Sequence, residues 1–155
     1  MNGNLPSLVG ALSTVAIVIV CVLWHYEGLS ILSRWVTHER LPPRPRIATI
    51  IFGQLLLHTA EIWIFAFGYY LLTLDPAYGV FHQAPYDTMA EPLAMSLLDQ
   101  VYYSAVVYTT LGFGDIVPGG SIRFLTGIEA VTGLVLITWS ASFTFLEMQR
   151  YWGRD

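Results

Sequence analysis

The chain has 155 residues, of which 55% are hydrophobic and only 12% are charged, and its net charge is −4 at pH 7. Soluble domains carry roughly 25% charged residues, so a chain this short and apolar is expected in a membrane. The mild negative charge argues against a nucleic-acid partner. A single cysteine, Cys21, excludes an internal disulfide and a metal site built on several thiolates.

Three long apolar segments predict three membrane-spanning helices. They cover about residues 8–24, 47–74 and 122–146. About 17–25 apolar residues cross the hydrocarbon core, and each segment must be helical because lipid cannot bond to free backbone groups. Residues 1–7 lack the positive charge of a signal peptide, so we expect the first segment to be retained.

The arginines predict the orientation of these helices. There is no lysine, and only Arg123 lies between the second and third spans. The other arginines lie between the first two spans or after the third: Arg34, Arg40, Arg44, Arg46, Arg150 and Arg154. The positive-inside rule then places residues 25–46 and the C-terminus in the cytoplasm, and the N-terminus outside. The absence of a cleavable signal and the short loops favour a bacterial inner membrane.

The segment between the first two spans has its own pattern. Residues 29–37 have apolar side chains at helical spacing, which predicts a short helix on the membrane surface. Pro42, Pro43 and Pro45 are then expected to form a stiff elbow. We therefore divide the chain into an N-terminal helix with a cytoplasmic linker, residues 1–46, and a second part, residues 47–155.

Between the second and third spans lies a short helical segment followed by Thr110-Leu-Gly-Phe-Gly-Asp115. The helix, expected over residues 97–109, is about 20 Å long and cannot cross the membrane, so it must enter and return. Gly112 and Gly114 alternate with larger residues. Because glycine adopts positive φ without strain, this pattern favours a backbone that alternates between left- and right-handed conformations.

The run Thr-Thr-Leu-Gly-Phe-Gly-Asp, residues 109–115, follows a short amphipathic helix, precedes Pro118 and a glycine-bearing span, and resembles the pore domain of potassium channels. The resemblance implies an all-α membrane protein with an outer helix at 47–74, a pore helix at 97–109, a filter at 110–115 and an inner helix at 121–150. It also implies a homotetramer, because each chain supplies one filter strand to a shared axis.

The resemblance assigns potassium ions to oxygen rings of the filter residues, in which backbone carbonyls replace the hydration shell of the ion. These residues are Thr110, Leu111, Gly112 and Phe113, followed by Gly114. Leu111 and Phe113 stand where valine and tyrosine are usual, and we expect both side chains to point away from the axis and wedge the filter against the pore helix. Phe113 lacks the hydroxyl that would brace a filter.

The resemblance also suggests roles around the filter. Asp115 would concentrate cations at the outer mouth and hydrogen-bond toward the pore helix, and Tyr102 and Tyr103 would form an aromatic cuff or simply lie at the membrane interface. Gly133 is either a hinge or a close-packing position. The expected cavity and inner gate comprise Gly133, Leu134, Ile137, Ala141 and Phe145.

Three ionisable residues lie within the spans: His58, Glu61 and Glu129. Such groups are costly in a membrane and are functional candidates by default. We expect them to form a buried polar network behind the filter, and the alternative is a role in the ion pathway or in proton sensing.

The sequence thus predicts a passive potassium channel subunit with membrane lipids as surroundings and no cofactor besides the permeant K⁺. A weakly selective monovalent cation channel and a non-conducting accessory subunit are the alternatives. A membrane enzyme built on His58 and Glu61 is disfavoured, because no third ligand or nucleophile is expected beside them.

Overall fold

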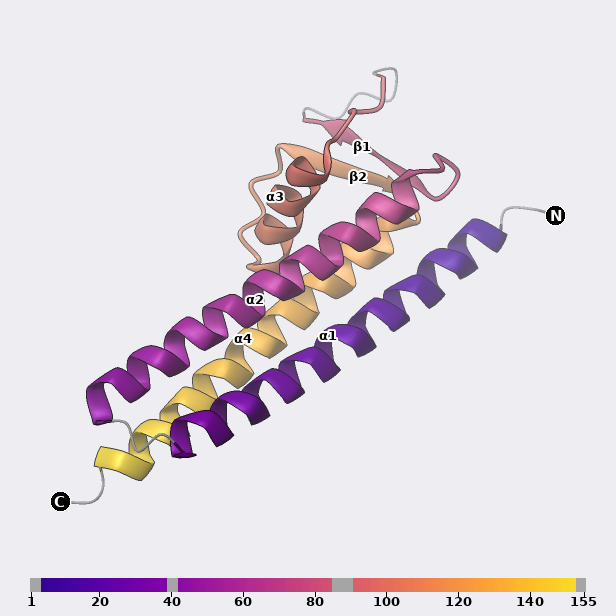
Figure 1. The fold of residues 1–155 in the computed structure, drawn as a ribbon. Coiled ribbons are helices and arrows are strands. Elements are labelled where there is room, and N and C mark those ends of the chain that lie inside the picture. The colour runs from indigo at the N-terminus through magenta and orange to yellow at the C-terminus, as the bar shows by residue number, and fades with distance from the viewer. Residues whose placement is uncertain (1–3, 39–41, 85–90, 153–155) are drawn as a thin grey trace.

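The computed structural model describes residues 4–38, 42–84 and 91–152. Three long helices run side by side, namely α1 (Asn4–His38), α2 (Pro43–Thr73) and α4 (Ile122–Trp152) (Figure 1). Each is long and apolar enough to cross a membrane. The predicted all-α membrane fold with three spanning helices is therefore confirmed. Arg40 and Arg154 lie outside the described residues.

Helix α1 corrects the expectation of a separate surface helix. It is continuous from Asn4 to His38, and residues 29–37 are simply its last turns. The reason is local, because no proline occurs between Pro6, in the first turn, and the end of the helix. The buried residues of these last turns, Leu29 and Val36, lie on a face covered by other helices, since α1 packs against α2 and α4.

Helix α2 also begins earlier than predicted. Pro42 is its N-cap, and Pro43 and Pro45 lie in its first turn. The backbone nitrogens of a first turn have no partner within the helix, so proline has little cost there. The expected elbow of three prolines is therefore wrong for Pro43 and Pro45, which lie in the first turn of α2.

The short helix α3 (Leu97–Tyr108) is capped at its N-terminus by its own sequence. The Ser96 hydroxyl accepts a hydrogen bond from the Asp99 backbone N–H at 3.2 Å, and the Ser96 backbone N–H donates to the Asp99 carboxylate at 2.8 Å. These bonds satisfy backbone groups that a helix start leaves free. The hydrogen bonds from the Ser96 side chain and backbone also hold the pKa of Asp99 below its ordinary value.

A two-stranded sheet, which the sequence did not lead us to expect, lies beside α3. Strand β1 (Gly79–Gln83) pairs antiparallel with β2 (Ile116–Gly120), with Gly79 opposite Gly120 and Gln83 opposite Ile116. Strand β2 follows directly after residues 110–115, and β1 follows the end of α2. The sheet therefore connects the segments before and after α3, next to the C-terminal end of α2 and the N-terminal end of α4 (Figure 1).

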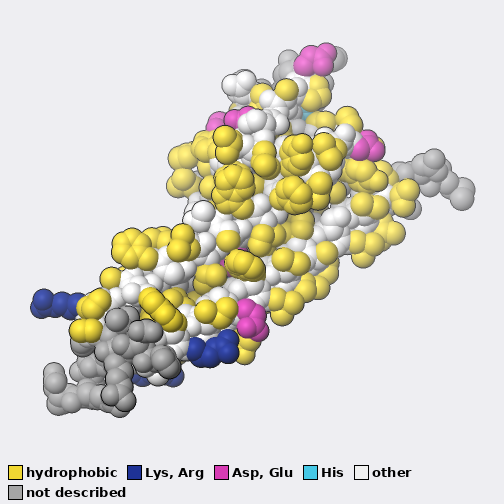
Figure 2. All heavy atoms as spheres, viewed as in Figure 1, with side chains coloured by type: hydrophobic (Ala, Val, Ile, Leu, Met, Phe, Trp, Pro, Cys, Tyr) yellow, Lys and Arg dark blue, Asp and Glu magenta, His cyan; other side chains and the backbone are white. Residues whose placement is uncertain are grey.

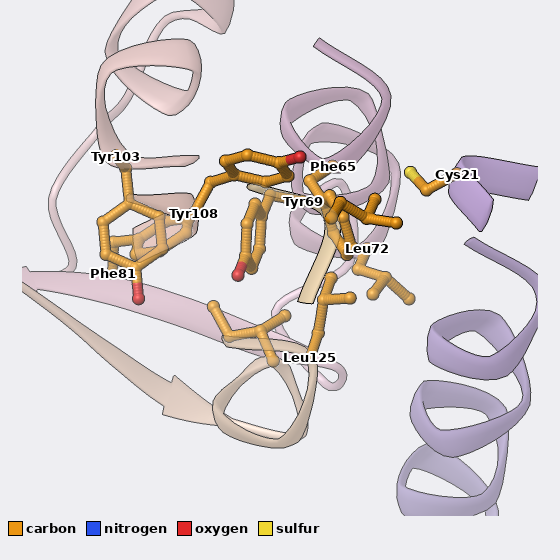
Figure 3. Packing of buried hydrophobic residues seen from close by; sticks show 10 residues of the cluster. Cys21, Phe65, Tyr69, Leu72, Phe81, Tyr103, Tyr108 and Leu125 are labelled. Carbon is orange, nitrogen blue, oxygen red and sulfur yellow. The ribbon is translucent and has the colours of Figure 1, made fainter. Parts of the chain in front are cut away.

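Aromatic rings form the core between these elements. The rings of Tyr69, Phe81 and Tyr103 meet edge to face at centroid distances of 4.8–5.8 Å (Figure 3). Cys21 of α1 and Leu125 of α4 belong to the same cluster. Each aromatic ring buries a large apolar area, so this cluster fixes α3 against the long helices.

Candidate ion-conduction site

The backbone of residues 110–115 alternates in handedness. Thr110, Gly112 and Gly114 have φ angles of 58°, 59° and 76°, and Leu111 and Phe113 between them do not have positive φ. Positive φ is uncommon for a residue other than glycine, so Thr110 is held there by its surroundings. Its backbone N–H donates to the Val107 carbonyl at 2.9 Å, in continuation of α3.

The end of α3 also holds the next two residues. The backbone N–H groups of Leu111 and Gly112 donate to the Val106 carbonyl at 3.0 and 3.3 Å. The carbonyl end of α3 is therefore directed toward the start of this segment, and a helix carries partial negative charge at that end. This arrangement favours a cation nearby.

The side chains of Leu111 and Phe113 do not pack inside the chain. Leu111 is 59% exposed and Phe113 63% exposed. The expected wedge between these residues and the pore helix is therefore not formed within one chain. Both large apolar side chains are therefore exposed on the surface of the single chain.

Asp115 is anchored to α3. The Tyr102 hydroxyl donates a hydrogen bond to the Asp115 carboxylate at 2.9 Å. On the other side, the backbone carbonyl of Asp115 accepts from the Ala84 N–H at 2.9 Å. The Asp115 end of the segment is thus held by a tyrosine of α3, although Phe113 itself carries no hydroxyl.

Tyr102 and Tyr103, expected as a pair, have different surroundings. Successive residues of a helix are rotated by about 100°, so they cannot share one environment. Tyr102 is exposed, whereas Tyr103 is buried in the aromatic core and its hydroxyl is 3.0 Å from the Thr126 hydroxyl. Tyr103 therefore supports α3 from its inner side, and only Tyr102 reaches residues 110–115.

His58 and Glu61 meet a partner that the sequence analysis missed. His25 of α1 lies with its Nδ1 2.8 Å from Glu61 Oε1, and His58 Nδ1 is 3.1 Å from Glu61 Oε2. The Tyr108 hydroxyl donates to the same carboxylate and lies 2.8 Å from His58 Nδ1. His25 directly follows the uncharged apolar run 8–24. This position at the end of the first span was the sequence feature that could have identified it as a candidate.

Glu129 belongs to a second, separate cluster. Its carboxylate accepts hydrogen bonds from the Tyr69 and Ser104 hydroxyls, each at 2.5 Å. Ser104 also lies 2.9 Å from the Ile62 carbonyl. The expected single network is therefore two clusters. Both reach α3, through Ser104 and, one turn later, Tyr108.

Gly133 lies against the end of α3. A Cβ atom at this position would be 2.1 Å from the backbone oxygen of Tyr108. No side chain fits there, and because glycine has none, α4 can contact the backbone of α3. The structure thus assigns Gly133 a close-packing role, and a bend at this residue remains a prediction.

The predicted lining residues of α4 divide into two groups. Leu134 and Phe145 are 54% and 59% exposed, and Ala141 is also exposed. Ile137 is half buried and packs against the core. The Ser140 hydroxyl lies 3.4 Å from His25 Nε2, and the Trp139 ring lies 5.2 Å from the His25 ring at an interplanar angle of 50°. Both positions therefore contact α1.

The comparisons with known proteins agree with this geometry. The family described as "Ion channel", which includes the pore domains of potassium channels, matches residues 50–150. The "Uncharacterized membrane protein YdjJ" of Bacillus subtilis (strain 168) is 38% identical over 96 residues, which are 59% of this chain and 26% of that protein. The chain thus spans about a quarter of this relative. No solved structure matches the chain significantly. By the match over residues 50–150, which includes α3, residues 110–115 and α4, this protein belongs to the ion channel family.

Proposed function

We propose that the chain is one subunit of a homotetrameric, potassium-selective channel. The observation that carries the proposal is the alternating backbone of residues 110–114, with positive φ at every second residue. Such alternation turns successive carbonyl oxygens toward one side, and four copies around an axis form stacked oxygen rings for a dehydrated cation. In this proposal the rings belong to Thr110, Leu111, Gly112 and Phe113.

A tetramer also accounts for the exposed residues. One chain supplies a single filter strand, so the axis closes only when several chains surround it. Leu111 and Phe113, exposed in one chain, would then pack against a neighbour. Four of the exposed residues of α4 would line the cavity, with Thr138 in place of Ile137, and Phe145 would narrow its inner end. These exposed positions are Leu134, Thr138, Ala141 and Phe145.

The proposed orientation places the filter at the outer face of a bacterial inner membrane. The start of α1 lies near the α3 end of the molecule, and the C-terminus lies at the opposite end (Figure 1). On the face that Figure 2 shows, arginine side chains gather at the C-terminal end, and the surface between the ends is largely hydrophobic. The positive-inside rule makes the arginine end cytoplasmic.

The test is ion flux from liposomes that contain the purified protein, with potassium inside and sodium outside. We expect flux with potassium, at least tenfold slower flux with sodium, and no flux from the Gly112→Asp variant, whose side chain would enter the oxygen rings. Gly127→Ala is the control, since a Cβ there meets nothing within 4 Å. Size-exclusion chromatography must show the same tetramer for all three proteins.

Each other outcome has a defined meaning. Equal flux of both ions would establish a weakly selective cation channel, a reading that the exposure of Leu111 and Phe113 in one chain also permits. If the wild-type tetramer carries no current, the Phe145→Ala variant should open a closed inner gate. No flux from either protein would leave an accessory subunit as the function and would contradict the proposal.

A second prediction concerns the bond between Tyr102 and Asp115. The Tyr102→Phe variant removes only the hydroxyl that holds the outer end of the filter. We expect the tetramer to form normally and the ratio of potassium to sodium permeability to fall severalfold, because the filter then accommodates both ions more easily. Bi-ionic reversal potentials measure this ratio. Tyr26→Phe, which changes an exposed tyrosine of α1, should leave the ratio unchanged.

A further inference from the structure

The cluster around Glu61 has a composition that conduction does not require. It joins His25 of α1, His58 and Glu61 of α2 and Tyr108 of α3. His25 lies outside residues 50–150, where the chain matches its family. The cluster therefore includes a part of this chain that the family match does not explain.

Two imidazoles and a carboxylate form a common ligand set for zinc. One ring nitrogen of His25, one ring nitrogen of His58 and a Glu61 carboxylate oxygen all lie within 4.8 Å of one another. Zinc binds imidazole nitrogen and carboxylate oxygen at about 2.0–2.2 Å in a tetrahedral arrangement, which separates ligand atoms by about 3.4 Å. His25 Nδ1 is 2.8 Å from Glu61 Oε1 and His58 Nδ1 is 3.1 Å from Glu61 Oε2, so these spacings need to lengthen by about 0.3–0.6 Å. The spacing between the two imidazole nitrogens is at most 4.8 Å and must approach the same value.

The surroundings of the three side chains suit a bound ion. The Tyr108 hydroxyl lies 2.8 Å from His58 Nδ1 and donates to the Glu61 carboxylate, so a further oxygen is present beside the three side chains. The other nitrogen of His25, Nε2, is 3.4 Å from the Ser140 hydroxyl, a contact of the kind that orients metal-binding imidazoles. The sequence analysis disfavoured chemistry at His58 and Glu61 for want of a third ligand, and His25 supplies it.

Burial adds a reason for a cation at this point. The side chains of His25 and Glu61 are fully buried, and only His58, at 16% exposure, reaches the surface. A carboxylate without water must be balanced by a nearby positive charge or by several hydrogen bonds. A divalent ion would supply that charge at the carboxylate itself.

We propose that His25, His58 and Glu61 bind a divalent transition-metal ion of the Zn²⁺ class, which fastens α1 to the outer helix and to the end of α3. Tyr108 ends α3 and stands two residues before Thr110. A bound ion at this place therefore restrains the backbone that leads into residues 110–115. Metal binding itself does not depend on which ion the channel conducts.

The experiment uses the full chain, purified in detergent and treated with a chelator, and titrates it with Co²⁺, whose tetrahedral complexes absorb visible light. We expect one Co²⁺ per chain, release of Co²⁺ by added Zn²⁺, and a rise in the melting temperature with either ion, because a ligand that binds only the folded state stabilises it. His25→Ala, His58→Ala and Glu61→Gln should each weaken binding at least tenfold.

His82→Ala is the matched control, because it removes a histidine that lies outside the cluster. It should bind Co²⁺ as the wild type does. Circular dichroism before metal addition shows whether each variant is folded, and His25→Gln replaces His25→Ala if the latter is not. A wild-type protein without the tetrahedral spectrum, or folded His25 and His58 variants with unchanged affinity, would overturn the proposal.

Discussion

The Gly133→Ala variant is expected to lose stability and flux, because its new methyl group would collide with the backbone of α3. The Cβ atom would lie 2.1 Å from the Tyr108 oxygen and 2.9 Å from the Tyr108 carbonyl carbon. Backbone atoms cannot rotate away as a flexible side chain does, so α4 must separate from α3. Overpacking of this kind costs about 1–3 kcal/mol. Thermal unfolding in detergent and flux from liposomes measure the two effects.

Gly127→Ala provides the control for this prediction within the same helix. Nothing lies within 4 Å of a Cβ atom at Gly127. Alanine is a better helix former than glycine by about 1 kcal/mol, so this variant should be as stable as the wild type or more stable. The same substitution should thus lower the stability at Gly133 and leave it unchanged or raise it at Gly127. Equal stability of the two variants would show that α4 does not contact α3 at Gly133.

The Glu129→Leu variant is expected to be the most damaging change in the second cluster. Leucine has a similar size, but it cannot accept the hydrogen bonds that Tyr69 and Ser104 donate at 2.5 Å. A buried donor without a partner costs about 1–3 kcal/mol. Part of this loss is recovered, because Tyr69 and Ser104 have second partners in Thr126 and Ile62. We therefore expect a loss of about 2 kcal/mol and a lower yield of assembled protein.

Glu129→Gln separates hydrogen bonding from shape. The amide oxygen of glutamine can accept a hydrogen bond from one of the two hydroxyls, Tyr69 or Ser104. Its NH₂ group can donate to the oxygen of the other hydroxyl, which then donates its own hydrogen to its second partner. Most of the stability should therefore remain, within about 1 kcal/mol of the wild type. If glutamine and leucine destabilise the protein equally in thermal unfolding, hydrogen bonds to Glu129 do not hold α3 in place.

Local features of the sequence determined the main elements. Long apolar runs fixed the three spanning helices, because the bilayer requires both length and internally bonded backbone. Ser96 and Asp99 mark the start of α3 through a capping box. The alternation of glycine with larger residues anticipated the positive φ at Gly112 and Gly114, although Thr110 adopts the same conformation without being glycine.

The predicted structure of residues 25–46, a separate surface helix followed by an elbow of prolines, was wrong. The apolar side chains at helical spacing over residues 29–37 were interpreted as a separate helix that lies along the membrane surface. A helix, however, ends where its backbone is interrupted, and no proline interrupts α1 before His38. Polar side chains such as His25 are instead accommodated by burial against a neighbouring helix.

Contacts between distant residues were decided only by the tertiary structure. His25 and Glu61 are 36 positions apart, and their meeting depends on how α1 is rotated against α2. The separation of Tyr102 from Tyr103 and the close approach of Gly133 to Tyr108 likewise depend on the rotation and spacing of packed helices. In a chain this apolar nearly every helix face can be buried, so hydropathy alone selects no face. The sequence by itself thus determined which segments are helices and which one carries the candidate filter. Only side-chain packing and the pairing of buried polar groups decided which residues meet behind it.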